Sequence, residues 1–121
     1  MIKVFNPNGT DQSSIFVDGG FKTDGTSLNK VIFTSLNDDN AGNPFDSNGD
    51  GNATMPSAGD WGSIKFRSVS DDSYCLLNYT EVKYGGNTKE GGVTFENASG
   101  QFTNSLVSNT SNYGVYCNGN S

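Results

Sequence analysis

A short acidic segment carries the clearest chemical signal in this sequence. Asp46, Asn48 and Asp50 place side-chain oxygens at the first, third and fifth positions of one turn-rich stretch, and Gly51 follows at the sixth. Calcium prefers oxygen ligands, and this spacing opens a widespread class of calcium-binding loop in which the glycine permits a sharp turn. The segment therefore predicts a calcium site. A solvated polar loop that has the same spacing by chance is the alternative.

The ligand set of this segment is incomplete by itself. Asn52 could offer its main-chain carbonyl at the seventh position, but Ser57 stands at the twelfth, where a bidentate glutamate is usual. Three more aspartates lie in the same stretch of chain and could fold back to complete the site. The full set of predicted calcium ligands is Asp46, Asn48, Asp50, Asn52, Asp60, Asp38 and Asp39.

The predicted site lies in a long insertion, residues 36–60, which is acidic and rich in glycine and asparagine. Loops longer than about 12–15 residues in a compact domain are usually functional or disordered. Short segments rich in β-branched and aromatic residues stand on both sides, at residues 31–35 and 62–66. We therefore expect two β-strands to hold the ends of this loop.

The same three short alternating segments recur along the chain in the same order. Leu77 and Phe102 are 25 residues apart, as are Val82 and Val107, and a third copy of the first segment begins at Tyr113. Helical periodicity is missing, because apolar residues do not recur at helical spacing over three turns. A repeat of three short strands every 20–29 residues indicates a parallel β-solenoid. The predicted fold class is all-β, with about three to four coils.

Alternation along the repeats predicts which side chains face the interior. Stacked coils should place equivalent inward residues above one another, and each coil alone cannot bury its inner face. Asn104 and Asn109 take the places of Tyr79 and Tyr84, so inward asparagines there would need hydrogen bonds. The predicted columns are Ile64/Val93/Val115, Phe66/Phe95/Cys117, Phe21/Leu77/Phe102 and Val31/Val82/Val107.

Part of this pattern resembles a known family. Residues 31–35, the pair Asp38 and Asp39, and residues 59–66, which read Gly-Asp-Trp-Gly-Ser-Ile-Lys-Phe, are similar to the repeat of right-handed parallel β-helix proteins of the pectate-lyase-like superfamily. The resemblance covers about residues 14–121 and implies a right-handed solenoid in a secreted or surface protein. That family includes polysaccharide lyases and hydrolases as well as surface proteins without known activity, so the resemblance implies the fold and not an activity.

The chain is expected to form one module over residues 1–121. Residues 1–13 would add a strand or cover one end of the core, and residues 36–60 form the acidic insertion. Signal-peptide features are not visible, so we expect either a start after a removed segment or a piece of a longer chain. Seven basic residues against thirteen acidic ones, a net charge of −6, argue against a nucleic-acid partner. No apolar run approaches the roughly 20 residues of a membrane span.

The two cysteines allow a geometric expectation. Cys117 falls in the column of Phe66 and Phe95, two coils away from Phe66, whereas Cys75 precedes the second strand of the coil of Phe66. Two coils correspond to about 9–10 Å of rise. A disulfide needs Cα atoms within about 7 Å. We therefore expect Cys117 to be a buried thiol and Cys75 to be unpaired.

The leading functional prediction is an extracellular or cell-surface β-helix module with a structural, adhesive or glycan-binding role, stabilised by calcium. Its partners would be further coils of a longer chain or copies of itself joined end to end, and a polysaccharide is a further candidate. One alternative is a self-assembling filament subunit. Another is a fragment of a polysaccharide lyase or glycoside hydrolase, although acids such as Asp71 and Asp72 are better explained as exposed turn residues than as a catalytic pair.

Overall fold

The chain folds into short strands that follow the predicted segments. The computed structural model describes residues 1–6, 13–87 and 90–121. Regular structure within these residues consists of eleven β-strands and one 3-10 turn, and no helix there is long and apolar enough to cross a membrane. The strands are β1 (Ile2–Val4), β2 (Ile15–Val17), β3 (Phe21–Asp24), β4 (Val31–Ser35), β5 (Ile64–Phe66), β6 (Cys75–Asn78), β7 (Thr80–Lys83), β8 (Gly91–Glu96), β9 (Gln101–Thr103), β10 (Leu106–Ser108) and β11 (Tyr113–Asn118), and the 3-10 turn is η1 (Asp72–Tyr74).

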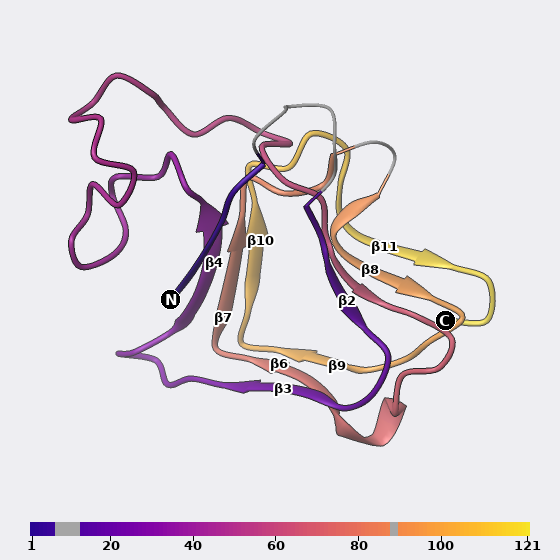
Figure 1. Cartoon of the computed structure of the whole chain (residues 1–121). Coiled ribbons are helices and arrows are strands. Elements are labelled where there is room, and N and C mark those ends of the chain that lie inside the picture. The colour runs from indigo at the N-terminus through magenta and orange to yellow at the C-terminus, as the bar shows by residue number, and fades with distance from the viewer. Residues whose placement is uncertain (7–12, 88–89) are drawn as a thin grey trace.

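The strands stack into three parallel sheets, which form the three sides of a solenoid (Figure 1). Sheet A has the order β1-β4-β7-β10, sheet B the order β2-β5-β8-β11, and sheet C the order β3-β6-β9. Each coil visits sheets B, C and A in turn, so β2, β3 and β4 make the first complete coil. Strand β1 precedes this coil, and β11 follows the third. The prediction of a short parallel β-solenoid is confirmed.

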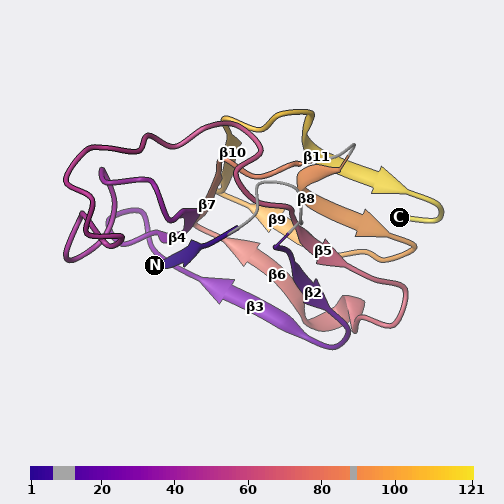
Figure 2. The same cartoon turned by 45° about the horizontal axis from the view of Figure 1, so that its top comes forward.

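The solenoid is right-handed. In Figure 1 the first coil runs clockwise from β2 through β3 to β4. Figure 2, in which the top has come forward, shows β2 and β11 at opposite ends of the stack, with β2 at the end nearer the viewer of Figure 1. The chain therefore recedes as it turns clockwise. This is the hand that parallel crossover connections adopt almost without exception.

The predicted columns of sheet B are confirmed. Phe66 lies beside Phe95, which lies beside Cys117, and the Ile64, Val93 and Val115 column forms in the same register. The rings of Phe66 and Phe95 are stacked, with centroids 4.8 Å apart. Strand β2 extends both columns by one coil.

The first coil is displaced from the prediction by two residues in sheets C and A. Phe21 lies beside Cys75 rather than Leu77, and Val31 lies beside Thr80 rather than Val82. A shift of two residues keeps every side chain on its predicted face. The observed columns are Thr23/Leu77/Phe102 and Phe33/Val82/Val107.

The corner before β4 explains the displacement in sheet A. The Gly25 N–H donates to the Asn78 carbonyl at 3.0 Å, and the Val31 N–H donates to the Tyr79 carbonyl at 3.0 Å. Residues 26–30 of the first coil therefore form an extra turn at a point where the second coil has only Tyr79. The spacing of the repeats in the sequence does not show at which residue such a turn interrupts the pairing of the strands.

Large apolar side chains from all three sheets fill the interior. Each contributes about 1.5–3 kcal/mol on burial. Trp61 also belongs to this core, and its indole Nε1 donates to the Lys83 carbonyl at 2.8 Å, so that its polar atom is satisfied. The fully buried members are Phe33, Trp61, Ile64, Phe66, Leu77, Val82 and Val93.

Four equivalent residues of the repeat form corners of the solenoid. Tyr79 and Asn104 have φ of 46° and 49°, and Tyr84 and Asn109 have φ of 63° and 52°, all in the left-handed region. Asparagine tolerates this region better than most residues. Asn104 and Asn109 are exposed, so the possibility of inward asparagines raised by the repeat is not realised.

The expectation of a buried Cys117 is wrong. Both cysteines are free thiols, but Cys75 is buried and Cys117 is exposed. Cys117 does occupy the inward column of Phe66 and Phe95. It is exposed because β11 is the edge strand of sheet B, and among the described residues no other strand pairs with its outer side.

Candidate metal centre

The acidic insertion projects beside sheet A and is anchored at both ends (Figure 1). At its start, Asp38 is buried and accepts a hydrogen bond from Thr34 Oγ1 at 2.6 Å, with Lys83 Nζ 3.5 Å away. At its end, Ser35 Oγ donates to Asp60 Oδ2 at 2.6 Å. Two of the predicted ligands, Asp38 and Asp60, are thus held by protein groups at the base of the loop.

The predicted ligand segment forms a tight turn around one carboxylate. Asp46 Oδ1 accepts hydrogen bonds from the N–H groups of Gly49 and Asp50 at 2.7 and 3.1 Å, and Oδ2 accepts one from the Gly51 N–H at 2.9 Å. Gly49 and Gly51 have φ of 74° and 77°, which glycine adopts without strain. The sequence folds this way because its glycines allow the main chain to wrap around the aspartate.

These contacts keep Asp46 ionised. The hydrogen bond from the Gly51 N–H is the main cause of a pKa below the ordinary value. Desolvation, the next largest effect, opposes this, and the N–H groups of Gly49 and Asp50 and the positive charge of Lys3 lower the pKa further. Asp46 is therefore a carboxylate across the neutral range.

Three carboxylates meet where this turn faces the start of the loop. One oxygen from each of Asp39, Asp46 and Asp50 lies within 4.8 Å of the other two. Oxygen ligands bound at about 2.3–2.6 Å from one calcium ion are at most about 5 Å from each other, so this spacing fits one ion. Without a cation, each pair of carboxylates at this distance would cost about 1–3 kcal/mol of repulsion.

The second observation at this cluster is an unsatisfied oxygen. Asp39 Oδ1 is closed off from solvent and has no hydrogen-bond partner among the described residues. A buried charged oxygen that neither water nor a donor reaches is costly. The carboxylate that carries this oxygen belongs to the cluster, which fits ligation of a cation, and the oxygen-only donor set suits calcium.

The remaining predicted ligands lie in the same turn but are engaged differently. The Asn48 side-chain amide donates to Asp50 Oδ2 and to Thr54 Oγ1, both at 3.0 Å, and its Oδ1 accepts the Asp50 N–H. Asn52 is exposed. The structure thus unites Asp39, Asp46 and Asp50, with Asn48 supporting Asp50.

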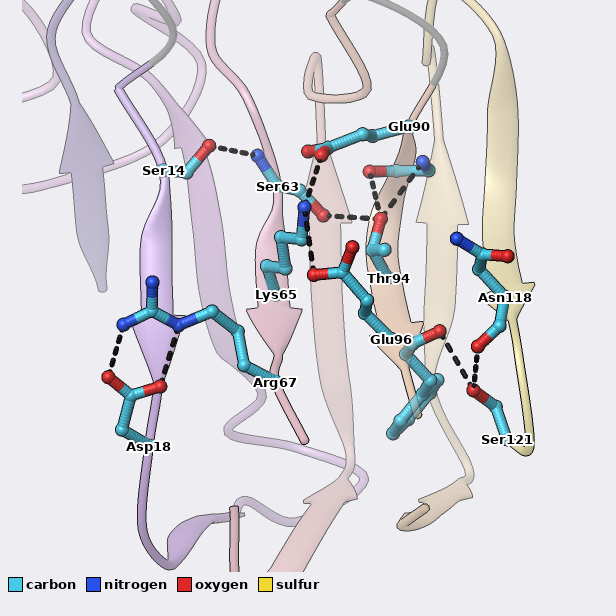
Figure 3. Close-up of polar contacts among 12 residues, drawn as sticks. Ser14, Asp18, Ser63, Lys65, Arg67, Glu90, Thr94, Glu96, Asn118 and Ser121 are labelled. Carbon is cyan, nitrogen blue, oxygen red and sulfur yellow. Dashed lines mark hydrogen bonds and ion pairs between the residues drawn. The ribbon is translucent and has the colours of Figure 1, made fainter. Parts of the chain in front are cut away.

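Charged side chains also gather on the outer face of sheet B, where they form ion pairs (Figure 3). Lys65 Nζ lies 2.7 Å from Glu90 and 3.3 Å from Glu96, and the hydrogen bond to Glu90 is the main cause of its raised pKa. Arg67 is hydrogen-bonded to Asp18 through two nitrogens. Lys65 and Arg67 share this face, and each is paired with acids of neighbouring strands or turns.

Sequence reasoning proposed Asp39 only as one of several acids that could fold back. Asp38 and Asp39 are adjacent, and the sequence holds no signal that separates the anchoring residue from the candidate ligand. Comparisons of this chain with protein-family models, with curated proteins and with solved structures found no match.

Proposed function

We propose that this protein is a structural module of an extracellular or cell-surface protein, stabilised by calcium, and related to the pectate-lyase-like parallel β-helix proteins. The observation that carries the calcium proposal is the meeting of one carboxylate oxygen from each of Asp39, Asp46 and Asp50, and the unsatisfied Asp39 Oδ1 on the same carboxylate group supports it. An ion there would offset the repulsion between these carboxylates and hold a loop of 25 residues that otherwise has little apolar burial.

The affinity expected of this site agrees with an extracellular role. Three carboxylates without a bidentate glutamate at the twelfth position form a weaker set than that of intracellular calcium sensors. Dissociation constants of about 10⁻⁴–10⁻³ M are typical of extracellular calcium modules. A site of this strength is filled where calcium is abundant.

Calorimetric titration tests the proposal. We expect one calcium ion to bind per chain, with a rise in the melting temperature against chelator. Asp46→Asn removes one charge and one of the two oxygens that accept main-chain N–H groups in the turn, and should weaken binding at least about tenfold. At calcium a hundredfold above the dissociation constant, ligation would stabilise the native state by about 2.7 kcal/mol.

The matched control for this titration is Asp24→Asn, an exposed acid on β3 outside the loop, which should leave calcium binding unchanged. Titration without heat, together with equal melting temperatures in calcium and in chelator, would overturn the proposal.

End-to-end assembly is a second candidate, favoured by apolar side chains at both ends of the stack. Val115 on the last strand of sheet B is 44% exposed and Ile2 on the first strand of sheet A is 46% exposed, and both stand in register with inward residues. Leu106, on the last strand of sheet A, is 52% exposed on the outer face, in register with Glu81. Stacked copies would set β10 against β1 and β11 against β2, leaving the space of one strand between β9 and β3. Unpaired strand edges of this kind are templates for association.

Light scattering over a range of concentrations tests this assembly. We expect a mass that rises with concentration and returns to the monomer in the double variant Leu106→Lys/Val115→Lys, because charges on edge strands oppose pairing. Leu28→Lys, at an exposed corner residue, is the control and should assemble as the parent does. A stable monomer of the parent chain at high concentration would contradict end-to-end assembly.

A further inference from the structure

Strand β1 is held weakly by the sheet itself. Its backbone pairs with β4 over three residues, and among the described residues β4 is its only strand neighbour. One further bond, from the Leu36 N–H to the Val4 carbonyl at 3.0 Å, continues the ladder into the first residue of the insertion. Ile2 remains half exposed. A short edge strand with so few contacts would fray without further support.

The acidic insertion supplies that support through Lys3 at the centre of β1. Lys3 Nζ donates to the Phe45 carbonyl at 2.7 Å. The side-chain stem of Lys3 also approaches Gly42 so closely that a Cβ there would lie 3.3 Å from Lys3 Cε. Lys3 and Met1 share a shallow hollow with loop residues Gly42, Asn43 and Ser47. The loop therefore covers one side of the edge strand.

Both contact points of Lys3 lie between two of the clustered carboxylates along the chain. Gly42 comes three residues after Asp39, and Phe45 comes directly before Asp46. An ion that joins Asp39 to Asp46 closes residues 39–46 into a ring and fixes both contact points at once. Without the ion, repulsion between these carboxylates opens the same ring.

We propose that cation binding at Asp39, Asp46 and Asp50 clamps β1 onto sheet A through Lys3, so that the metal controls whether this edge of the solenoid is covered. This inference rests on the cation site proposed above. When the clamp opens, β1 is released and the backbone of β4 becomes the free edge of the sheet. The ligand at the site thus regulates access to a strand edge that it does not touch.

Hydrogen exchange with calcium or with chelator tests the clamp in the whole chain. Calcium should slow the exchange of the amides of β1 and of Leu36 at least about tenfold, whereas the amides of β5 and β8, inside the stack, serve as the reference and change less. In Lys3→Met, which keeps the apolar stem, calcium should still bind calorimetrically but no longer protect β1. Lys22→Met on β3 is the matched control and should behave as the parent chain.

Three other outcomes would each contradict the inference in a different way. Calcium binding without any change in β1 exchange would overturn the clamp and leave the cation site standing. Equal protection of β1 in Lys3→Met would exclude Lys3 as the link between the loop and the strand. Absence of calcium binding in the parent chain would overturn both the site and the clamp.

Discussion

Replacing Phe66 by alanine should lower the free energy of unfolding by about 3–5 kcal/mol, the cost of a large cavity in a filled core. The ring is 1% exposed and lies between Phe95, stacked at 4.8 Å, and Phe21, which it meets edge-on at 6.0 Å. Because these three rings come from two sheets and three coils, the cavity would loosen contacts within a coil and between coils. Urea denaturation followed by circular dichroism measures the loss.

The matched control is Phe16→Ala, on the neighbouring strand of the same sheet. The Phe16 ring points outward, is 55% exposed and has Arg67 over its face at 4.7 Å. Loss of this exposed cation–π contact should cost less than about 1 kcal/mol. Similar losses in the two variants would mean that Phe66 is not at the centre of the stack.

The adjacent aspartates at the start of the insertion should respond to alanine substitution in opposite ways. Asp38→Ala should lower the free energy of unfolding by about 2–3 kcal/mol in calcium and in chelator alike, because it leaves the Thr34 hydroxyl without its acceptor and Lys83 without its acidic partner. Asp39→Ala should cost little in chelator, where its charge is repelled by Asp46 and Asp50, but should abolish the stabilisation by calcium. Thermal unfolding of each variant under both conditions measures the difference.

The pH dependence of stability gives a second test of the role of Asp38. Burial raises the pKa of Asp38, but the hydrogen bond from Thr34 and the charge of Lys83 outweigh it, so the folded pKa is lowered. A lowered folded pKa contributes stability above the unfolded value near 4, and that stability is lost as the pH falls through the folded pKa. In chelator, Asp38→Ala should therefore flatten the acid limb of the stability profile. A calcium response retained by Asp39→Ala, or an unchanged acid limb in Asp38→Ala, would contradict this assignment.

The regular part of the solenoid could be read from spacing because the corner between sheets C and A has the same length in the second and third coils. Leu77 and Phe102, 25 residues apart, lie side by side, and Phe66 lies on Phe95 despite a different loop length. The register failed where the first coil carries its extra turn over residues 26–30, which a count of residues cannot place. The left-handed corners also escaped notice, since Tyr79 and Tyr84 are poor signals for positive φ.

The candidate site divides in the same way into local and long-range parts. Asp46 and Asp50 lie in a turn whose geometry depends on the glycines beside them, so the sequence was sufficient to place these two acids close together. The approach of Asp39 depends on where the chain goes after β4, and on Asp38 being held by Thr34, four residues earlier, and by Lys83 of the second coil. The contact with Lys83 joins two coils, and no short-range pattern in the sequence records it.

The strands run across the axis of the stack, and this orientation determines how the module would respond to a mechanical force. Within the described residues, the strands of each coil pair only with those of the adjacent coils. A force applied between the two ends would then break the interstrand hydrogen bonds of one coil at a time. It would not load all of them together in shear. Each released coil of about 25 residues would lengthen the chain by at most roughly 85 Å. Such a module would unfold in steps and absorb work over a long extension. A sheet loaded along its strands would resist the force until all its interstrand hydrogen bonds broke together.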